Sequence, residues 1–122
     1  MNNFQNSKPV YDLEERTFLF AKNTRLFVKA LPKTIINIDD VKQLIRATGS
    51  VGANYIEANE SLSKKDFVMR IKICRKEAKE SAYFLRLLNE TNEITNKNEV
   101  ERLTQEAIEL KKIFSSIIEK SK

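Results

Sequence analysis

The chain has 122 residues, of which 41% are hydrophobic and 32% charged, and its formal net charge is +5. This length and composition fit one soluble domain with a buried core. Only two Gly and two Pro occur, too few for the many tight turns of an all-β fold, so the sequence predicts a few long helices. It contains no His, which removes the commonest general base and disfavours an enzyme.

The first predicted helix begins near Asp12, which can cap it, and ends at Leu31, directly before Pro32. Residues 1–11 are predicted to be a flexible tail, and residues 12–122 a single domain. Leu19 and Leu26 lie away from the main apolar face, which indicates a second contact surface, the alternative being scattered exposed leucines. The main face is predicted to carry Leu13, Thr17, Phe20, Thr24, Phe27, Val28 and Leu31.

The second predicted helix begins near Asp39, capped by Asn37 or Asp39, and reaches about Asn59. Its apolar spacing continues unbroken through both glycines of the chain, which places Gly49 and Gly52 inside the helix. The predicted inner face consists of Val41, Leu44, Ile45, Thr48, Gly52 and Tyr55.

A glycine inside a helix costs about 1 kcal/mol relative to alanine, so we expect close helix packing to offset that cost. Asn54 and Glu57 are expected to form hydrogen bonds or ion pairs at this contact, with Arg46 or a basic residue of the third helix as the partner. The predicted small-residue helix contact comprises Gly49, Gly52, Ala53, Asn54 and Glu57.

The motif "GSVG" in this stretch also has the form of a nucleotide-clamping GxxG loop. That module needs strands and a basic residue between the glycines, and the sequence supplies neither. Glu57 and Glu60, one turn apart, are a conceivable carboxylate pair for catalysis, but without His or a second carboxylate motif the pair is weak.

The third predicted helix starts after Ser63, which forms a capping-box spacing with Asp66, and runs to about Asn92. It carries two apolar stripes and therefore has two surfaces to bury. The main stripe is Phe67, Ile71, Cys74, Ala78, Ala82, Leu85 and Leu88. The second stripe is Met69, Ile73, Phe84 and Leu87.

The fourth predicted helix starts near Asn96, with Glu99 as its capping partner. Its apolar residues alternate at spacings of three and four, a heptad seam made of Val100, Leu103, Ala107, Leu110, Phe114 and Ile117. Because the connections between the four helices are short, neighbours should be antiparallel. The sequence therefore predicts an all-α, up-down-up-down four-helix bundle.

Basic side chains concentrate on the third helix, where residues 63–92 hold eight basic and four acidic groups. Six of them share one sector, away from both apolar stripes, and are predicted to contact the phosphates of RNA or DNA. The alternative is a solvated face neutralised by Glu77 and Glu80. The six candidates are Lys65, Lys72, Arg75, Lys76, Lys79 and Arg86.

No segment approaches the roughly 20 apolar residues that span a bilayer, and the start has no apolar signal region. The single cysteine, Cys74, cannot form an internal disulfide and is expected in the core. We therefore expect a cytoplasmic protein, with no membrane, metal or cofactor.

The stretch "RATGSVGANYIEANESLSKKDFVMRIKICRKEAKESAYFLRLL" resembles the signature region of the bacterial four-helix-bundle proteins named after intervening sequences in 23S ribosomal RNA. The pattern departs from that family at Tyr55-Ile56 and at Phe84, where a Trp often stands. The matching residues are Arg46-Ala47, Ser50 to Asn54, Glu57-Ala58, Ser63 to Phe67, Lys76 to Ala78, Glu80 and Tyr83 to Leu88.

The resemblance implies a bundle that assembles as a ring-shaped homopentamer. A related branch, the accessory proteins of diversity-generating retroelements, is similarly basic and binds nucleic acid and a reverse transcriptase. The biochemical function of the wider family is not established, and no catalytic residues carry over.

A closed ring needs two different contact surfaces on each subunit. The candidate subunit-interface residues are Leu19, Leu26, Met69, Ile73, Phe84 and Leu87. The leading hypothesis is a non-enzymatic, oligomeric protein that binds RNA or DNA without sequence preference. The alternative is a scaffold that organises a protein such as a reverse transcriptase, and an enzyme is the third hypothesis.

Overall fold

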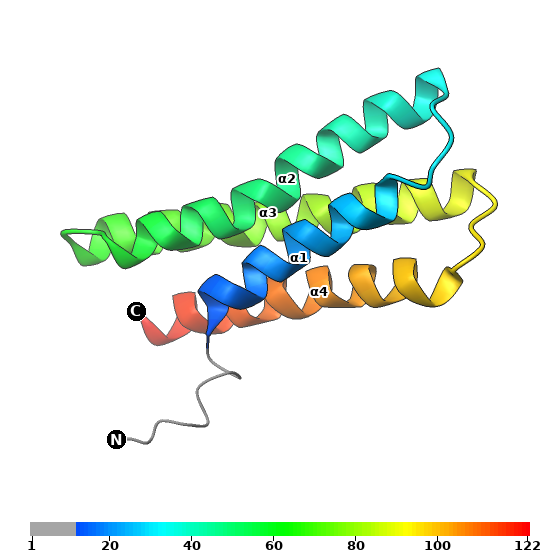
Figure 1. The fold of residues 1–122 in the computed structure, drawn as a ribbon. Coiled ribbons are helices and arrows are strands. Elements are labelled where there is room, and N and C mark those ends of the chain that lie inside the picture. The colour runs from blue at the N-terminus through cyan, green and yellow to red at the C-terminus, as the bar shows by residue number, and fades with distance from the viewer. Residues whose placement is uncertain (1–11) are drawn as a thin grey trace.

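The computed structural model describes residues 12–122, which form four helices and no strand. The helices are α1 (Leu13–Val28), α2 (Ile35–Asn59), α3 (Lys64–Thr91) and α4 (Lys97–Lys120). Successive helices run antiparallel, so the α2–α3 connection and the C-terminus lie at one end of the bundle, and the other two connections lie at the opposite end (Figure 1). The predicted up-down-up-down four-helix bundle is confirmed; the predicted tail, residues 1–11, lies outside the described residues.

Three of the predicted helix caps are present. The side chains of Asp12, Ser63 and Asn96 each accept a hydrogen bond, 3.1 Å long, from the backbone N–H three residues later. Each bond satisfies one of the N–H groups that have no partner inside the helix. These local signals fix where α1, α3 and α4 begin.

The predicted boundaries of the connection between α1 and α2 were wrong. α1 ends at Val28, because its last turn tightens: Ala30 N donates to Phe27 O and Leu31 N donates to Val28 O. α2 begins at Ile35, one turn before the predicted start, with Thr34 as its N-cap. Since the first turn of α2 exposes its isoleucines, apolar spacing could not reveal it.

Asn37 is a buried residue of α2 and not its cap. Its Nδ2 donates to Asn92 Oδ1 at 2.8 Å, and Asn92 Nδ2 donates to Asn37 Oδ1 at 3.0 Å. Asn37 Nδ2 also donates to Pro32 O, and Asn92 Nδ2 to Leu88 O. This paired amide contact ties the start of α2 to the end of α3.

All four helices contribute to one core, with the largest contacts between α2 and α3 and between α3 and α4. The inner face of α2 is rotated from the predicted one: Ala47, Val51 and Ala58 are buried, whereas Val41 and Tyr55 are half-buried. The largest fully buried apolar side chains are Leu44, Val51, Ile71, Leu85, Leu88, Val100, Leu103, Leu110 and Phe114.

Two buried threonines lie on the inner face of α1. Thr17 Oγ1 donates to Leu13 O at 2.7 Å, and Thr24 Oγ1 donates to Phe20 O at 2.8 Å. A buried hydroxyl without a partner is costly, and each of these bonds satisfies the hydroxyl within its own helix. Thr17 also packs directly against Gly52 of α2, so α1 lies close to α2 at this point.

Candidate nucleic-acid interface

The six basic residues predicted to contact phosphates lie on one face of α3, here called the cationic face: Lys65, Lys72, Arg75, Lys76, Lys79 and Arg86. Five are exposed and Arg75 is half-buried. From Lys65 to Arg86 the helix rises about 32 Å, close to one turn of B-form DNA. A straight helix thus holds the six charges along a line long enough to follow a nucleic-acid backbone.

Four of the six cations have no carboxylate partner within 4.0 Å among residues 12–122, namely Lys65, Lys72, Arg75 and Lys79. Lys76 Nζ lies 3.8 Å from Glu77 Oε2, a loose contact. Arg86 Nε donates to Glu90 Oε2 at 2.9 Å, one turn further along α3. Both partners of the Arg86–Glu90 pair are exposed, and exposed pairs contribute little to stability and exchange readily for another anion.

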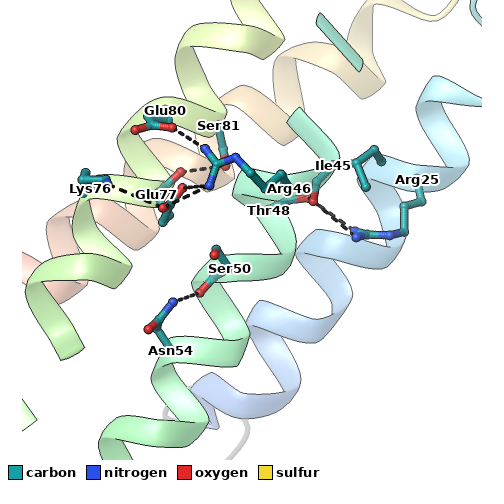
Figure 2. Close-up of polar contacts among 10 residues, drawn as sticks. All are labelled: Arg25, Ile45, Arg46, Thr48, Ser50, Asn54, Lys76, Glu77, Glu80 and Ser81. Atoms are coloured by element: carbon teal, nitrogen blue, oxygen red, sulfur yellow. Dashed lines mark hydrogen bonds and ion pairs between the residues drawn. The ribbon is translucent and has the colours of Figure 1, made fainter. Parts of the chain in front are cut away.

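The two glutamates that the alternative reading assigned to neutralise this face are directed toward α2 (Figure 2). Arg46 Nη1 lies 3.3 Å from Glu77 Oε1, and Arg46 Nη2 lies 2.7 Å from Glu80 Oε1. The hydrogen bond to Glu77, with the charge of that carboxylate, raises the pKa of Arg46 above its ordinary value. One arginine from the neighbouring helix therefore occupies both carboxylates.

Buried Glu77 is the more constrained of the two glutamates, because only 5% of its side chain is exposed. A buried carboxylate needs a cation and hydrogen bonds, and Arg46 supplies both. Figure 2 shows Arg46 reaching from α2 across to the Glu77 and Glu80 side chains on α3. Apart from opposite charge, no local sequence pattern predicts this pair, since the partners are 31 positions apart.

Gly52, in the predicted small-residue contact, lies against Thr17 of α1. A Cβ at position 52 would lie 3.0 Å from Thr17 Oγ1 and 3.3 Å from Thr17 Cβ. A Cβ at position 49 would lie 3.2 Å from Arg25 Nη2. That guanidinium donates to Ile45 O and Thr48 Oγ1, bridging α1 and α2 beside Gly49 (Figure 2).

Asn54 lies on the α3 side of α2. Its Nδ2 donates to Ser50 O at 2.9 Å (Figure 2), and its Oδ1 accepts a 2.9 Å hydrogen bond from Arg70 Nη1 of α3. This bond occupies Arg70, which lies outside the cationic face. Ala53 is exposed and lines a groove beside α1.

The expected pairing of Glu57 with Arg46 or a third-helix base was wrong. Glu57 is exposed and makes no ion pair with any of residues 12–122. Arg46 is 11 positions earlier on the same helix, about 16 Å away along its axis, and faces Glu77. Arg70 of α3 lines the same hollow as Glu57, but its guanidinium donates to Asn54.

The six residues predicted at subunit interfaces occur on two separate surfaces. On α1, Leu19 and Leu26 are exposed, and Leu19 lines a groove beside α4. On α3, Met69 is exposed, whereas Ile73, Phe84 and Leu87 are half-buried. Phe84 packs against the core and contacts the ring of Tyr83 edge to face.

An apolar groove lies between α1 and α2, with a volume of about 520 Å³. We call it the α1–α2 groove; its apolar lining is Phe18, Ala21, Leu26, Gly49, Gly52, Ala53 and Ile56. Phe18 and Ile56 were not among the predicted contact residues; their exposed fractions are 59% and 49%. Their spacing does not continue the main apolar face of either helix, so periodicity alone does not select them.

Residues 12–122 contain no group of three or more Cys, Asp or Glu side chains that could hold a metal ion. Cys74 is buried, its Sγ donates to Val51 O at 3.4 Å, and burial raises the pKa of its thiol from 9.0 to about 12. The thiolate is the reactive form of cysteine, so this side chain is an unreactive part of the core. Binding of anions is the chemistry that the charged surface supports.

The fold and the cationic face define an all-α four-helix bundle with an incompletely neutralised basic helix. The chain belongs to the 23S rRNA-intervening sequence protein family, which it matches over residues 11–116, and the resemblance noted in the sequence is thereby confirmed. It is similar to a protein of unknown function from the S23 ribosomal protein family of Bacteroides thetaiotaomicron. The two chains are 31% identical, with 86% of this chain and 96% of that chain covered and a TM-score of 0.73.

No curated protein matches this chain. The descriptions of the family and of the similar structure name no enzymatic activity. None of the four helices in residues 12–122 combines the length and the apolar character needed to cross a membrane.

Proposed function

We propose that this protein is a non-enzymatic, oligomeric nucleic-acid-binding protein that holds RNA or DNA through the cationic face of α3, without sequence preference. The observation that supports it most is the diversion of Glu77 and Glu80 to Arg46. Arg46 partly compensates the charge of both carboxylates, so less of that charge is available to the lysines of α3, although Glu77 Oε2 also lies 3.8 Å from Lys76 Nζ. The net charge of +5 adds long-range attraction for a polyanion.

The form of the binding follows from the residue types. Lysines and arginines on a helix surface contact phosphate oxygens. These contacts position the protein on the nucleic acid but do not distinguish one base sequence from another. Four unpaired cations correspond to about four phosphate contacts. Each phosphate contact releases counterions. It therefore adds about −0.9 for duplex DNA, or about −0.7 for a single strand, to the slope of log affinity against log salt concentration.

A fluorescence anisotropy titration with labelled oligonucleotides at 50 and 200 mM salt tests this proposal. Four phosphate contacts predict that affinity falls by about 50- to 150-fold between the two concentrations, depending on the number of strands. Oligonucleotides of different sequence should bind with similar affinity. Absence of binding at 50 mM salt would contradict the proposal.

A second candidate function is a scaffold that organises a protein partner such as a reverse transcriptase, with the charge serving solubility. The α1–α2 groove favours it, because Phe18 and Leu26 expose more than half of their side chains there. Contiguous exposed apolar surface marks protein contact sites. If this function is correct, charge reversal on α3 leaves partner capture intact, whereas Leu26→Asp in the groove abolishes it.

The proposal includes self-association, in the ring-shaped homopentamer that the family resemblance implies, and a cytoplasmic location. A head-to-tail ring needs two different surfaces per subunit, and exposed apolar side chains occur on both α1 and α3. Light scattering tests it: a pentamer has a mass of about 71 kDa, five times the 14.2 kDa of the chain. A mass of 14.2 kDa would contradict self-association.

A further inference from the structure

An exposed aromatic ring lies within the cationic face. Lys72, Lys76, Lys79, Tyr83 and Arg86 follow one another along α3 at spacings of four, three, four and three residues. Residues at these spacings are neighbours on one side of a helix. Tyr83 therefore stands in line with the cations, about 6 Å from Lys79 and about 4.5 Å from Arg86 along the helix axis.

Tyr83 is held in place by Phe84 but remains open to solvent. The two ring centroids are 5.2 Å apart and the rings are nearly perpendicular, at 84°. Phe84 packs against the core, whereas 59% of Tyr83 is exposed. The Tyr83 hydroxyl forms no hydrogen bond with any other side chain or backbone group of residues 12–122. A polar partner within the protein therefore does not explain the position of the ring.

A fixed, exposed aromatic ring between cations has the chemistry that recognises unpaired bases. Cations contact the phosphates, while the ring offers a flat apolar surface on which one base can stack. A duplex hides the faces of its bases, whereas a single strand exposes them. Stacking is tolerant of sequence because every base has an aromatic face.

We infer that the cationic face prefers single-stranded nucleic acid over duplex, with Tyr83 as the residue on which a base stacks. This inference rests on the proposed function, because it adds a base contact to the same phosphate-binding site. There are two competing explanations. The cationic face could bind duplex through charge alone, or the Tyr83 ring could contact a protein.

The test compares wild type with Tyr83→Ala, Tyr83→Phe and Phe18→Ala, after circular dichroism has shown that each variant is folded. Phe18→Ala is a matched control, since Phe18 is also 59% exposed but lies on α1. The probes are a labelled 20-nucleotide DNA strand, the RNA strand of the same sequence, and the corresponding DNA duplex, all at 50 mM salt. The RNA and DNA arms identify which kind of single strand is preferred.

The expected result is a loss of roughly 5- to 150-fold in single-strand affinity for Tyr83→Ala. Duplex affinity should change by less than twofold, and the salt slope should stay unchanged, because no phosphate contact is lost. Tyr83→Phe and Phe18→Ala should bind like wild type. In a Tyr83→Trp variant, whose tryptophan would be the only one in the chain, fluorescence should be quenched by the single strand and not by the duplex.

Three results would overturn the inference. If wild type binds both probes equally and Tyr83→Ala changes neither affinity, the proposed function stands and the base contact is wrong. If Tyr83→Ala lowers the mass measured by light scattering, the ring is a subunit contact. If wild type binds no probe at 50 mM salt, the proposed function and this inference fail together.

Discussion

Arg46 of α2 holds the buried Glu77 of α3, with its Nη1 3.3 Å from each carboxylate oxygen. The same guanidinium reaches Glu80 at 2.7 Å. This contact joins the two helices and also supplies a positive charge that partly compensates two carboxylates beside the cationic face. Stability and surface charge are thus linked through one arginine.

Replacing Arg46 with methionine is expected to destabilise the bundle by about 2 kcal/mol, because it leaves the Glu77 carboxylate buried without a cation. The estimate is below the full cost of breaking a buried pair, since half of the Arg46 side chain is exposed. Urea unfolding measures the change. The double variant Arg46→Met, Glu77→Met should recover most of the loss; an equal or larger loss would contradict the account.

Gly52→Ala is expected to destabilise the protein by about 1 kcal/mol, although alanine is the better helix former. Its Cβ would lie 3.0 Å from Thr17 Oγ1 and 3.3 Å from Thr17 Cβ, so the buried Thr17 side chain has to give way. Gly49→Ala is the matched control: its Cβ meets the end of the flexible Arg25 side chain. We expect that variant to be neutral or slightly more stable than wild type in thermal unfolding.

A double-mutant cycle with Thr17→Ala identifies the contact. Removing the Thr17 hydroxyl should make Gly52→Ala less costly than it is in wild type, by about 0.5–1 kcal/mol. Additive effects would show that the close approach of α1 is not the reason for glycine at position 52.

The burial of Cys74 should make the stability of the protein depend on pH in the alkaline range. Burial raises the pKa of the folded thiol to about 12 from its ordinary value of 9.0, so above pH 9 the unfolded chain loses this proton first. The free energy of unfolding should therefore fall by up to about 1.4 kcal/mol per pH unit from roughly pH 9 toward pH 12, with the full contribution present below pH 9. Comparing urea unfolding of wild type and Cys74→Ala at pH 8 and 10.5 isolates this contribution; equal losses would contradict it.

The same burial predicts that the thiol does not react while the protein is folded. A thiol-modifying reagent at pH 8 should label Cys74 only as fast as the chain unfolds, and immediately in denaturant. Rapid labelling of the folded protein would show that Cys74 is accessible.

Much of the fold could be predicted from the sequence because its determinants are local. Asp12, Ser63 and Asn96 cap their helices through hydrogen bonds to residues only three positions later. The heptad spacing of α4 can likewise be recognised from its own residues, without knowing which helix it packs against. The start of α2 could not be predicted in this way. There Asn37 is buried by pairing with Asn92, 55 positions away, and nothing local distinguishes it from a capping residue.

For the candidate site, the positions of the basic residues followed from helix periodicity, but their state of pairing did not. Glu77 lies 3.3 Å from Arg46 and 3.8 Å from Lys76, and its contact with Arg46 depends on how α2 packs on α3, which is a tertiary property. Tyr83 has the same helical spacing as these basic residues, but a search for charged residues alone does not select an uncharged side chain. Its significance comes from its exposure and from its contact with Phe84.

Moving the positive charge between surfaces distinguishes binding through the cationic face from binding through net charge. The variant Lys72→Glu, Arg75→Glu, Lys79→Glu and the control Lys22→Glu, Lys42→Glu, Lys112→Glu both change the net charge from +5 to −1, but only the first alters the cationic face. In anisotropy titrations across a salt series, we expect the first variant to lose binding or most of its salt slope, while the control keeps the wild-type slope with a modest loss of affinity. Equal losses in the two variants would contradict it, because binding would then depend on net charge and not on the cationic face of α3.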